Sequence, residues 1–139
     1  MDVKRRQILA GLAAAGAVPG VVPDIALAHI LPATPETPMF GLIGKMTVQP
    51  GKRDELAAIL LEGVSGMPGC LGYVVANDPE DADALWITEV WIDEAHHRAS
   101  LSLPSVQAAI ARGRPLITGF PMHQKTTPLG GHGLPQAAS

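Results

Sequence analysis

The segment Ala84–Ile92 reads ALWITEVWI, and it limits the fold more than any other part of the chain. Side chains alternate along a β-strand, so its odd and even positions face opposite ways. The two sets are Leu85, Ile87, Glu89 and Trp91, and Trp86, Thr88, Val90 and Ile92. Both are mostly apolar. Since a domain of about 90 residues covers one sheet face with its own helices, the other face needs a second surface, and we expect a sheet-to-sheet homodimer.

The pattern along the chain predicts strands and helices in the order β-α-β-β-α-β. Turn residues and prolines separate the segments, and the apolar period changes between two and about 3.6 residues. The expected strands are Phe40–Val48, Cys70–Asn77, Ala84–Ile92 and Phe120–Thr127. One helix follows Pro50-Gly51, and a second helical region runs from Glu94, after an Asp93 cap, to Ile117, with a break at Pro104. This order predicts an α+β, ferredoxin-like fold with an antiparallel sheet.

The N-terminus has the order of charged, apolar and small-residue regions that is typical of a signal peptide. Lys4-Arg5-Arg6 precedes an apolar stretch, and Ala26-Leu27-Ala28 offers a cleavage site. The adjacent arginines resemble a twin-arginine export signal, although Lys4 stands where a serine or threonine is usual. An uncleaved anchor is the alternative, but glycines and prolines interrupt the short apolar stretch. Residues 1–28 therefore predict export to the periplasm or beyond, with no stable membrane anchor after cleavage.

The remaining chain divides into a linker or arm (29–38), one folded domain (39–127) and a flexible tail (128–139). From His29 onward it carries seven basic and eleven acidic residues, a formal charge of −4, so no basic face is expected for nucleic acid. The single Cys70 cannot form an intramolecular disulfide. The histidines, including His123 and His132, show no metal-ligand spacing, and we expect no metal.

From Met39 to Phe120 the sequence resembles the antibiotic biosynthesis monooxygenase (ABM) family, a group of dimeric α/β barrels that includes quinol monooxygenases. The resemblance rests on four short segments and one tryptophan. They are Gly51–Leu56 (GKRDEL), Pro68–Tyr73 (PGCLGY), Trp86, Glu89–Trp91 (EVW) and Glu94–Ser100 (EAHHRAS). These residues are more specific for the fold than for one reaction, because the same scaffold serves several chemistries.

The resemblance implies oxygen insertion into a phenol or hydroquinone without a metal or flavin cofactor. The substrate then acts as its own electron donor, because its anion can pass an electron to dioxygen. Such a reaction requires a base, hydrogen-bond donors for the developing oxyanion, and a dry pocket. The expected partners are therefore a small aromatic substrate, dioxygen and a second copy of the chain.

Four residues are candidates for this site. The resemblance places His97 at the family's histidine, and a histidine suits proton abstraction near neutral pH. Asn77 can donate and accept hydrogen bonds, Trp86 offers an indole N–H and a flat apolar ring, and Tyr73 offers a hydroxyl. Each also has a structural interpretation: a histidine in a helix's first turn, a turn-forming asparagine, or core aromatics. For the neighbouring His96 we favour the structural role.

Glu89 is a carboxylate in the middle of an apolar strand, so it needs a partner or a raised pKa. Either an arginine or lysine pairs with it across the dimer, or it lies near the mouth of the pocket. If Trp86 faces the helices, it joins His97 at the site, and Glu89 and Trp91 then face the dimer partner.

Two other functions stay open. One is a non-catalytic ligand-binding or stress-related barrel. The other is haem degradation, which ranks last because the relatives that perform it have an asparagine on their first strand, and the expected first strand here, Phe40–Val48, contains none.

Overall fold

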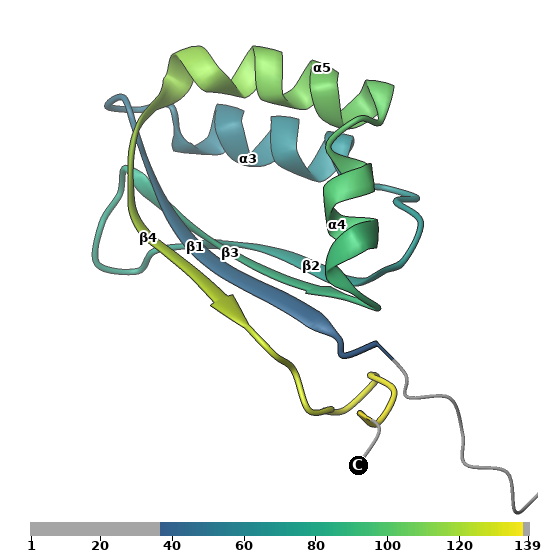
Figure 1. Ribbon diagram of the computed structural model, residues 1–139. Coiled ribbons are helices and arrows are strands. Elements are labelled where there is room, and N and C mark those ends of the chain that lie inside the picture. Colours follow the sequence, from purple (N-terminus) through teal and green to yellow (C-terminus); the bar gives the residue numbers. More distant parts are fainter. Residues whose placement is uncertain (1–36, 138–139) are drawn as a thin grey trace, which may run out of the picture. The chain divides into compact units, whose positions relative to one another are not determined.

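The computed structural model describes residues 37–137 (Figure 1). The predicted signal peptide and most of the predicted linker lie outside the described residues, and export stays a prediction. In the part that is described, no helix combines the length and the apolar character needed to cross a bilayer. Beyond the last strand, Leu129 O accepts a hydrogen bond from Ala137 N, so the tail folds back on itself.

Four strands form one antiparallel sheet in the order β2-β3-β1-β4 (Figure 1). They are β1 (Phe40–Val48), β2 (Cys70–Asn77), β3 (Ala84–Trp91) and β4 (Ile117–Thr126). Strands adjacent in the sequence do not simply pair in order, since β1 lies between β3 and β4. This arrangement confirms the predicted ferredoxin-like antiparallel sheet.

Three helices lie on one side of this sheet. They are α3 (Arg53–Gly63), α4 (Glu94–Ser100) and α5 (Pro104–Gly113), followed by the 3-10 turn η1 (Arg114–Leu116). Figure 1 shows α3 and α5 side by side above the sheet, with α4 closing one end of the space between them and the sheet. The Asp93 side chain accepts a hydrogen bond from His96 N and caps α4, and Pro104 occupies the first turn of α5, so the predicted break in the second helical region is confirmed.

The last strand begins three residues earlier than predicted, at Ile117 rather than Phe120. The apolar stripe of the second helical region was expected to reach Ile117, but α5 ends at Gly113 and η1 carries the chain round to the sheet. Ile117 pairs with Val48 at the end of β1, and Gln49 N donates to Leu116 O beside it. Ile117 is therefore apolar because it lies in a strand against the core.

Helices α3 and α5 approach each other closely because small residues meet at their contact. A Cβ built on Gly63 would lie 2.6 Å from Cβ of Ala109, and one built on Gly113 would lie 3.0 Å from a methyl carbon of Leu56. Leu56 and Leu85 are fully buried beneath them and pack with Val48. The helix pair thus holds one side of the apolar core.

The helices cover the odd positions of β3, the set that contains Glu89 and Trp91. Leu85, Ile87 and Trp91 are 0, 1 and 1% exposed. Trp91 and Glu89 lie opposite Phe40 and Leu42 of β1, which belong to the same core face. The arrangement in which Trp86 faces the helices, and Glu89 and Trp91 face a dimer partner, is therefore not the one found, because this face of β3 is buried by the chain's own helices.

Trp86 lies on the other face of the sheet, where no described helix covers it. Its indole Nε1 donates to Asp78 Oδ2 at 2.9 Å, and the Lys45 ammonium lies 2.7 Å from the same oxygen and 5.4 Å from the indole ring. Lys45 and these hydrogen bonds hold the pKa of Asp78 well below its usual range. Val74 and Met122 on this face are 55 and 44% exposed, so the face combines one partly buried ion pair with open apolar area.

We expect Leu56→Ala to lower the free energy of unfolding by about 2–5 kcal/mol, because it leaves a cavity at a fully buried position. Leu61, on the same helix, is 56% exposed, and Leu61→Ala should change the stability by no more than about 0.5 kcal/mol. Urea unfolding of both variants measures the difference. Equal losses for the two would show that α3 does not bury the face described.

Candidate functional site

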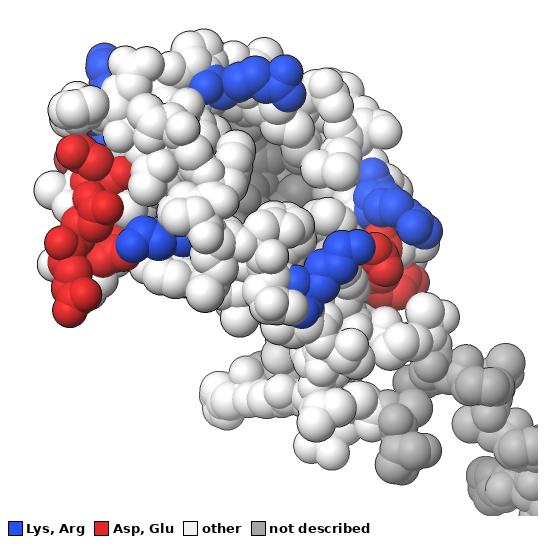
Figure 2. Space-filling view, turned by 60° about the vertical axis from the view of Figure 1, so that its left-hand side comes forward, with Lys and Arg blue, Asp and Glu red and all other residues white. Residues whose placement is uncertain are grey.

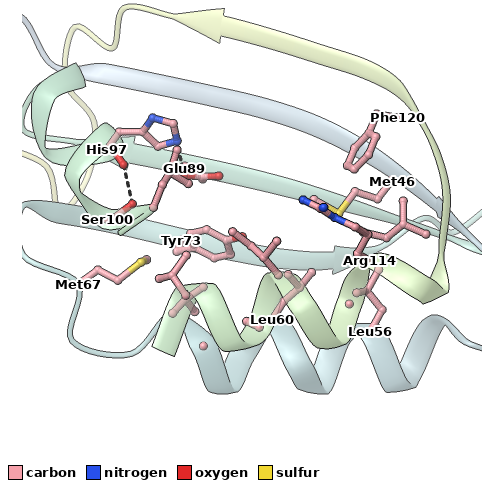
Figure 3. A pocket seen from close by; sticks show the side chains of 18 of the residues that line it. Met46, Leu56, Leu60, Met67, Tyr73, Glu89, His97, Ser100, Arg114 and Phe120 are labelled. Carbon is pink, nitrogen blue, oxygen red and sulfur yellow. Dashed lines mark hydrogen bonds and ion pairs between the residues drawn. The ribbon is translucent and has the colours of Figure 1, made fainter. Parts of the chain in front are cut away.

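An apolar cavity of about 520 Å³ lies between the helices and the covered face of the sheet (Figure 3). Its size falls within the range of small-molecule sites. All three described helices and all four strands contribute residues to its wall. Apolar lining residues include Met46, Leu56, Leu60, Val64, Met67 and Val106.

Glu89 and His97 form the polar centre of one end of this cavity. Glu89 Oε2 lies 3.7 Å from His97 Nε2 and accepts a 2.8 Å hydrogen bond from Trp91 Nε1. The Glu89 and His97 side chains are only 11 and 18% exposed. Burial raises the pKa of the Glu89 carboxyl above its ordinary value, while the Trp91 N–H and the neighbouring His97 act in the opposite direction.

His97 is held by contacts on several sides. Its ring centroid lies 4.9 Å from that of Phe40 and 5.5 Å from that of Trp91, which it meets edge-on. Ser100 Oγ donates a hydrogen bond to the His97 carbonyl, drawn as a dashed line in Figure 3. Asp93, four residues earlier, caps α4 and so fixes where the helix begins. With that start, the His97 side chain points toward Glu89. The imidazole therefore lies packed between the rings of Phe40 and Trp91.

Tyr73 supplies a third polar group to the same end. It lies opposite Glu89 in the β2–β3 register and lines the cavity (Figure 3). Burial, and then the nearby Glu89 carboxyl, raises the pKa of Tyr73 well above its usual range, so its hydroxyl stays protonated at neutral pH. Within residues 37–137 that hydroxyl has no hydrogen-bond partner, and it is available to a ligand.

Asn77 and Trp86 do not join His97 and Tyr73. Asn77 is exposed at the end of β2, beyond the cavity wall, and Trp86 lies on the opposite face of the sheet beside Asp78. The placement of Trp86 in the same pocket as His97 is corrected by this facing. His96 has a structural position, since its Nδ1 and backbone N both lie within hydrogen-bond distance of Asp93 Oδ1.

The cavity also contains residues that the sequence did not single out as site residues. The sequence leaves the facing of Glu89 and Trp91 open, and the structure places both in the cavity wall. Arg114, at the end of α5, lines the cavity away from Glu89 and carried no local signal beyond its charge. The fold and this site define a small α+β domain with a buried carboxylate–imidazole pair in an apolar pocket.

Comparison with models of known protein families shows which family this domain belongs to. The model of the family described as "Antibiotic biosynthesis monooxygenase" matches residues 39–112, more than half of the chain. The chain therefore belongs to the antibiotic biosynthesis monooxygenase family, as its sequence pattern indicated. No match was found among functionally curated proteins.

Solved structures show the same fold. A Chloroflexus aurantiacus J-10-fl protein that bears the same family name is 65% identical, with a TM-score of 0.68, over 70% of this chain and 99% of that one. SnoaB from Streptomyces nogalater, a cofactor-independent oxygenase solved as a point mutant, is 18% identical, with a TM-score of 0.57, over 66% of this chain and 94% of its own. At that identity the likeness to SnoaB shows the fold alone.

We expect Glu89→Gln to raise the melting temperature at pH 8 and to raise it less at pH 4. Burial raises the pKa of Glu89 above 4.5, so the folded protein binds this proton more tightly than the unfolded chain does. The stabilisation that this tighter binding gives is complete at pH values below the pKa of Glu89 in the unfolded chain. It is lost as the pH rises through the pKa of Glu89 in the folded protein. Glutamine keeps an oxygen for the Trp91 N–H and removes the charge.

Thermal unfolding followed by circular dichroism at both pH values gives the measurement. The Glu62→Gln variant serves as the control, because the Glu62 side chain is 70% exposed. A Glu89→Gln effect that is the same at pH 4 and pH 8, or a lower melting temperature at pH 8, would contradict the described burial.

Proposed function

We propose that the protein is a cofactor-independent monooxygenase that oxidises a small aromatic, a quinol or polyketide-like phenol, with dioxygen. The observation that carries this proposal is the Glu89–His97 pair, a candidate proton acceptor buried at one end of an apolar cavity. Family membership and the named activity of SnoaB, which has the same fold, support it.

The first step of the proposed reaction is removal of a phenolic proton. A substrate hydroxyl beside His97 Nε2 gives its proton to the Glu89–His97 pair, and the carboxylate 3.7 Å away stabilises the imidazolium that forms. The Trp91 N–H fixes the carboxylate while this happens. The protonated Tyr73 hydroxyl donates a hydrogen bond to the phenolate oxygen.

The second step is electron transfer from this anion to dioxygen. For a hydroquinone, one oxygen atom enters the ring and the other leaves as water, so hydroquinone and O₂ give a hydroxyquinone and H₂O. The substrate supplies all the electrons, which is why the residues need only hold the anion and exclude water. The apolar wall of the cavity suits both dioxygen and an aromatic ring.

A ligand-binding protein without turnover is the second candidate. One observation favours it: two of the four residues expected at the site, Asn77 and Trp86, lie outside the cavity. The remaining groups, Tyr73, Glu89 and His97, would then orient a bound aromatic without activating it.

Oxygen uptake distinguishes the two candidates. Metal-free protein is mixed with a panel of hydroquinones and anthrone-like phenols, and oxygen consumption is recorded against the spontaneous rate. The monooxygenase proposal expects uptake with at least one member of the panel. Saturable binding of a panel member with no uptake above the spontaneous rate would contradict it and favour the binding protein.

In the same assay we expect His97→Ala to lower kcat by about 10²–10⁴, the usual contribution of a positioned acid or base. His96→Ala is the matched control, because the adjacent His96 bonds to Asp93 and does not line the cavity. Both variants are assayed below their melting temperatures. An equal loss for the two would remove His97 from the proposed mechanism.

We also propose that the uncovered sheet face pairs with a second copy of the chain. Val74 lies on that face, and Leu61 lies on α3 with a similar exposure, 55 against 56%. Wild type and Leu61→Asp should elute as dimers in gel filtration with light scattering, and Val74→Asp should shift toward monomer because its charge would be buried. A monomeric wild type at micromolar concentration would overturn this assembly.

A further inference from the structure

Arg114 is a charged residue at the opposite end of the cavity from the Glu89–His97 pair. Figure 3 shows its side chain beside Met46 and Phe120, far along the sheet from His97. Its backbone N–H donates to Ile110 O at the end of α5, and Pro115 follows it directly. The backbone of Arg114 is therefore fixed, and its guanidinium reaches the cavity from a defined point.

The Arg114 guanidinium has no carboxylate within 4.0 Å among residues 37–137, nor a side-chain hydrogen bond there. Two other arginines of the domain have partners, and a third, Arg98, does not line the cavity. Arg112, two residues earlier, lies 3.0 Å from Glu62, and Arg53 donates to the backbone oxygens of Asp78 and Asp81. A guanidinium presents a planar fork of donors that matches a carboxylate, so the free fork at the cavity wall is suited to an anionic group.

The surroundings of Arg114 are apolar and partly open. Phe120 is 60% exposed, although it is a large aromatic residue, and Met46 lies on the neighbouring strand. Their side chains, with the guanidinium, form a surface on which an aromatic ring can lie. The cavity end at Arg114 thus offers both an apolar contact and a positive charge.

The charge distribution around the cavity favours an anionic ligand in one orientation. Within the described part of the chain, Glu89 is the only acidic residue in the wall of the cavity, and it lies at the far end from Arg114. Figure 2 shows a hollow with basic side chains around it, while most acidic ones gather at one edge of the molecule. Four acidic residues belong to the β2–β3 turn, Asp78–Asp83. A carboxylate would be attracted to the Arg114 end and repelled from the Glu89 end.

We infer that the substrate is an aromatic acid whose carboxylate is bound by Arg114 while its oxidisable hydroxyl lies at the Glu89–His97 end. This inference rests on the proposed function for the identity of the reacting end. The orientation of the bound acid depends only on the difference in charge between the two ends of the cavity, with Arg114 at one end and Glu89 at the other. Arg114 is then the residue that selects charged over neutral aromatics.

Binding without oxygen tests the inference apart from turnover. The probe is 6-hydroxy-2-naphthoate, which carries a hydroxyl and a carboxylate at opposite ends, and its control is 6-hydroxy-2-naphthamide, which has nearly the same shape without the charge. Titration calorimetry at pH 7.5 and constant ionic strength, in oxygen-free buffer, gives both Kd values. We expect the acid to bind about 10–100-fold more tightly than the amide, as charge-assisted hydrogen bonds to a guanidinium imply.

Arg114→Gln should bring the two Kd values to within about threefold, because only the acid loses a charged partner. Arg112→Gln, which removes a charge two residues away but no cavity group, should keep the wild-type preference. Three outcomes would overturn the inference. They are equal Kd values for the acid and the amide in wild type, the same loss of preference in Arg114→Gln and Arg112→Gln, and no binding of either probe. Preferential binding of the acid, together with no oxygen uptake across the panel of hydroquinones and phenols, would leave it standing and contradict only the proposed oxygenase activity.

Discussion

The burial of Glu89 is the constraint on which the rest of the site depends. A carboxylate in an apolar cavity is costly unless hydrogen bonds or a counter-charge compensate it. Two side chains from different parts of the chain offset part of this cost, the Trp91 N–H from the same strand and the His97 imidazole from α4. The short helix α4 therefore places the His97 imidazole beside the Glu89 carboxylate.

The layered arrangement keeps this polar pair inside an otherwise apolar space. Helices α3 and α5 touch closely where Gly63 meets Ala109. The cavity lies beneath the pair, between it and the sheet (Figures 1 and 3). Its two ends differ in charge, with a carboxylate and imidazole at one and a guanidinium at the other. A cavity of this kind can hold an elongated aromatic in one orientation, which is what a selective reaction at one ring position requires.

Local sequence signals predicted the elements well because they act within a few residues. Alternation marked the strands, and the Asp93 cap and Pro104 marked the starts of α4 and α5. The start of β4 was missed because Ile117 fits a helical stripe as well as a strand, and only its pairing with Val48 decides between them. The family resemblance was confirmed because its residues are spread along the whole domain.

The facing of β3 could not be predicted with the same certainty, because alternation separates two faces without saying which one the helices cover. Both sets on β3 contain a tryptophan and aliphatic residues, so composition did not decide. A weak signal lay in β1, where Phe40, Leu42 and Met46 form the more apolar set, but it applies to β3 only once the register is known. The family resemblance indicated His97, whereas its pairing with Glu89 is a tertiary contact between segments with no shared pattern.

The central claim, that the Glu89–His97 pair receives the hydroxyl proton of an aromatic ligand, is tested most directly by a crystal structure with 6-hydroxy-2-naphthoate bound under anaerobic conditions. The account predicts the ligand in the cavity with its hydroxyl oxygen about 3 Å from His97 Nε2 or a Glu89 carboxylate oxygen. A ligand whose hydroxyl lies away from both residues, or one bound on the opposite sheet face beside Trp86, would contradict it.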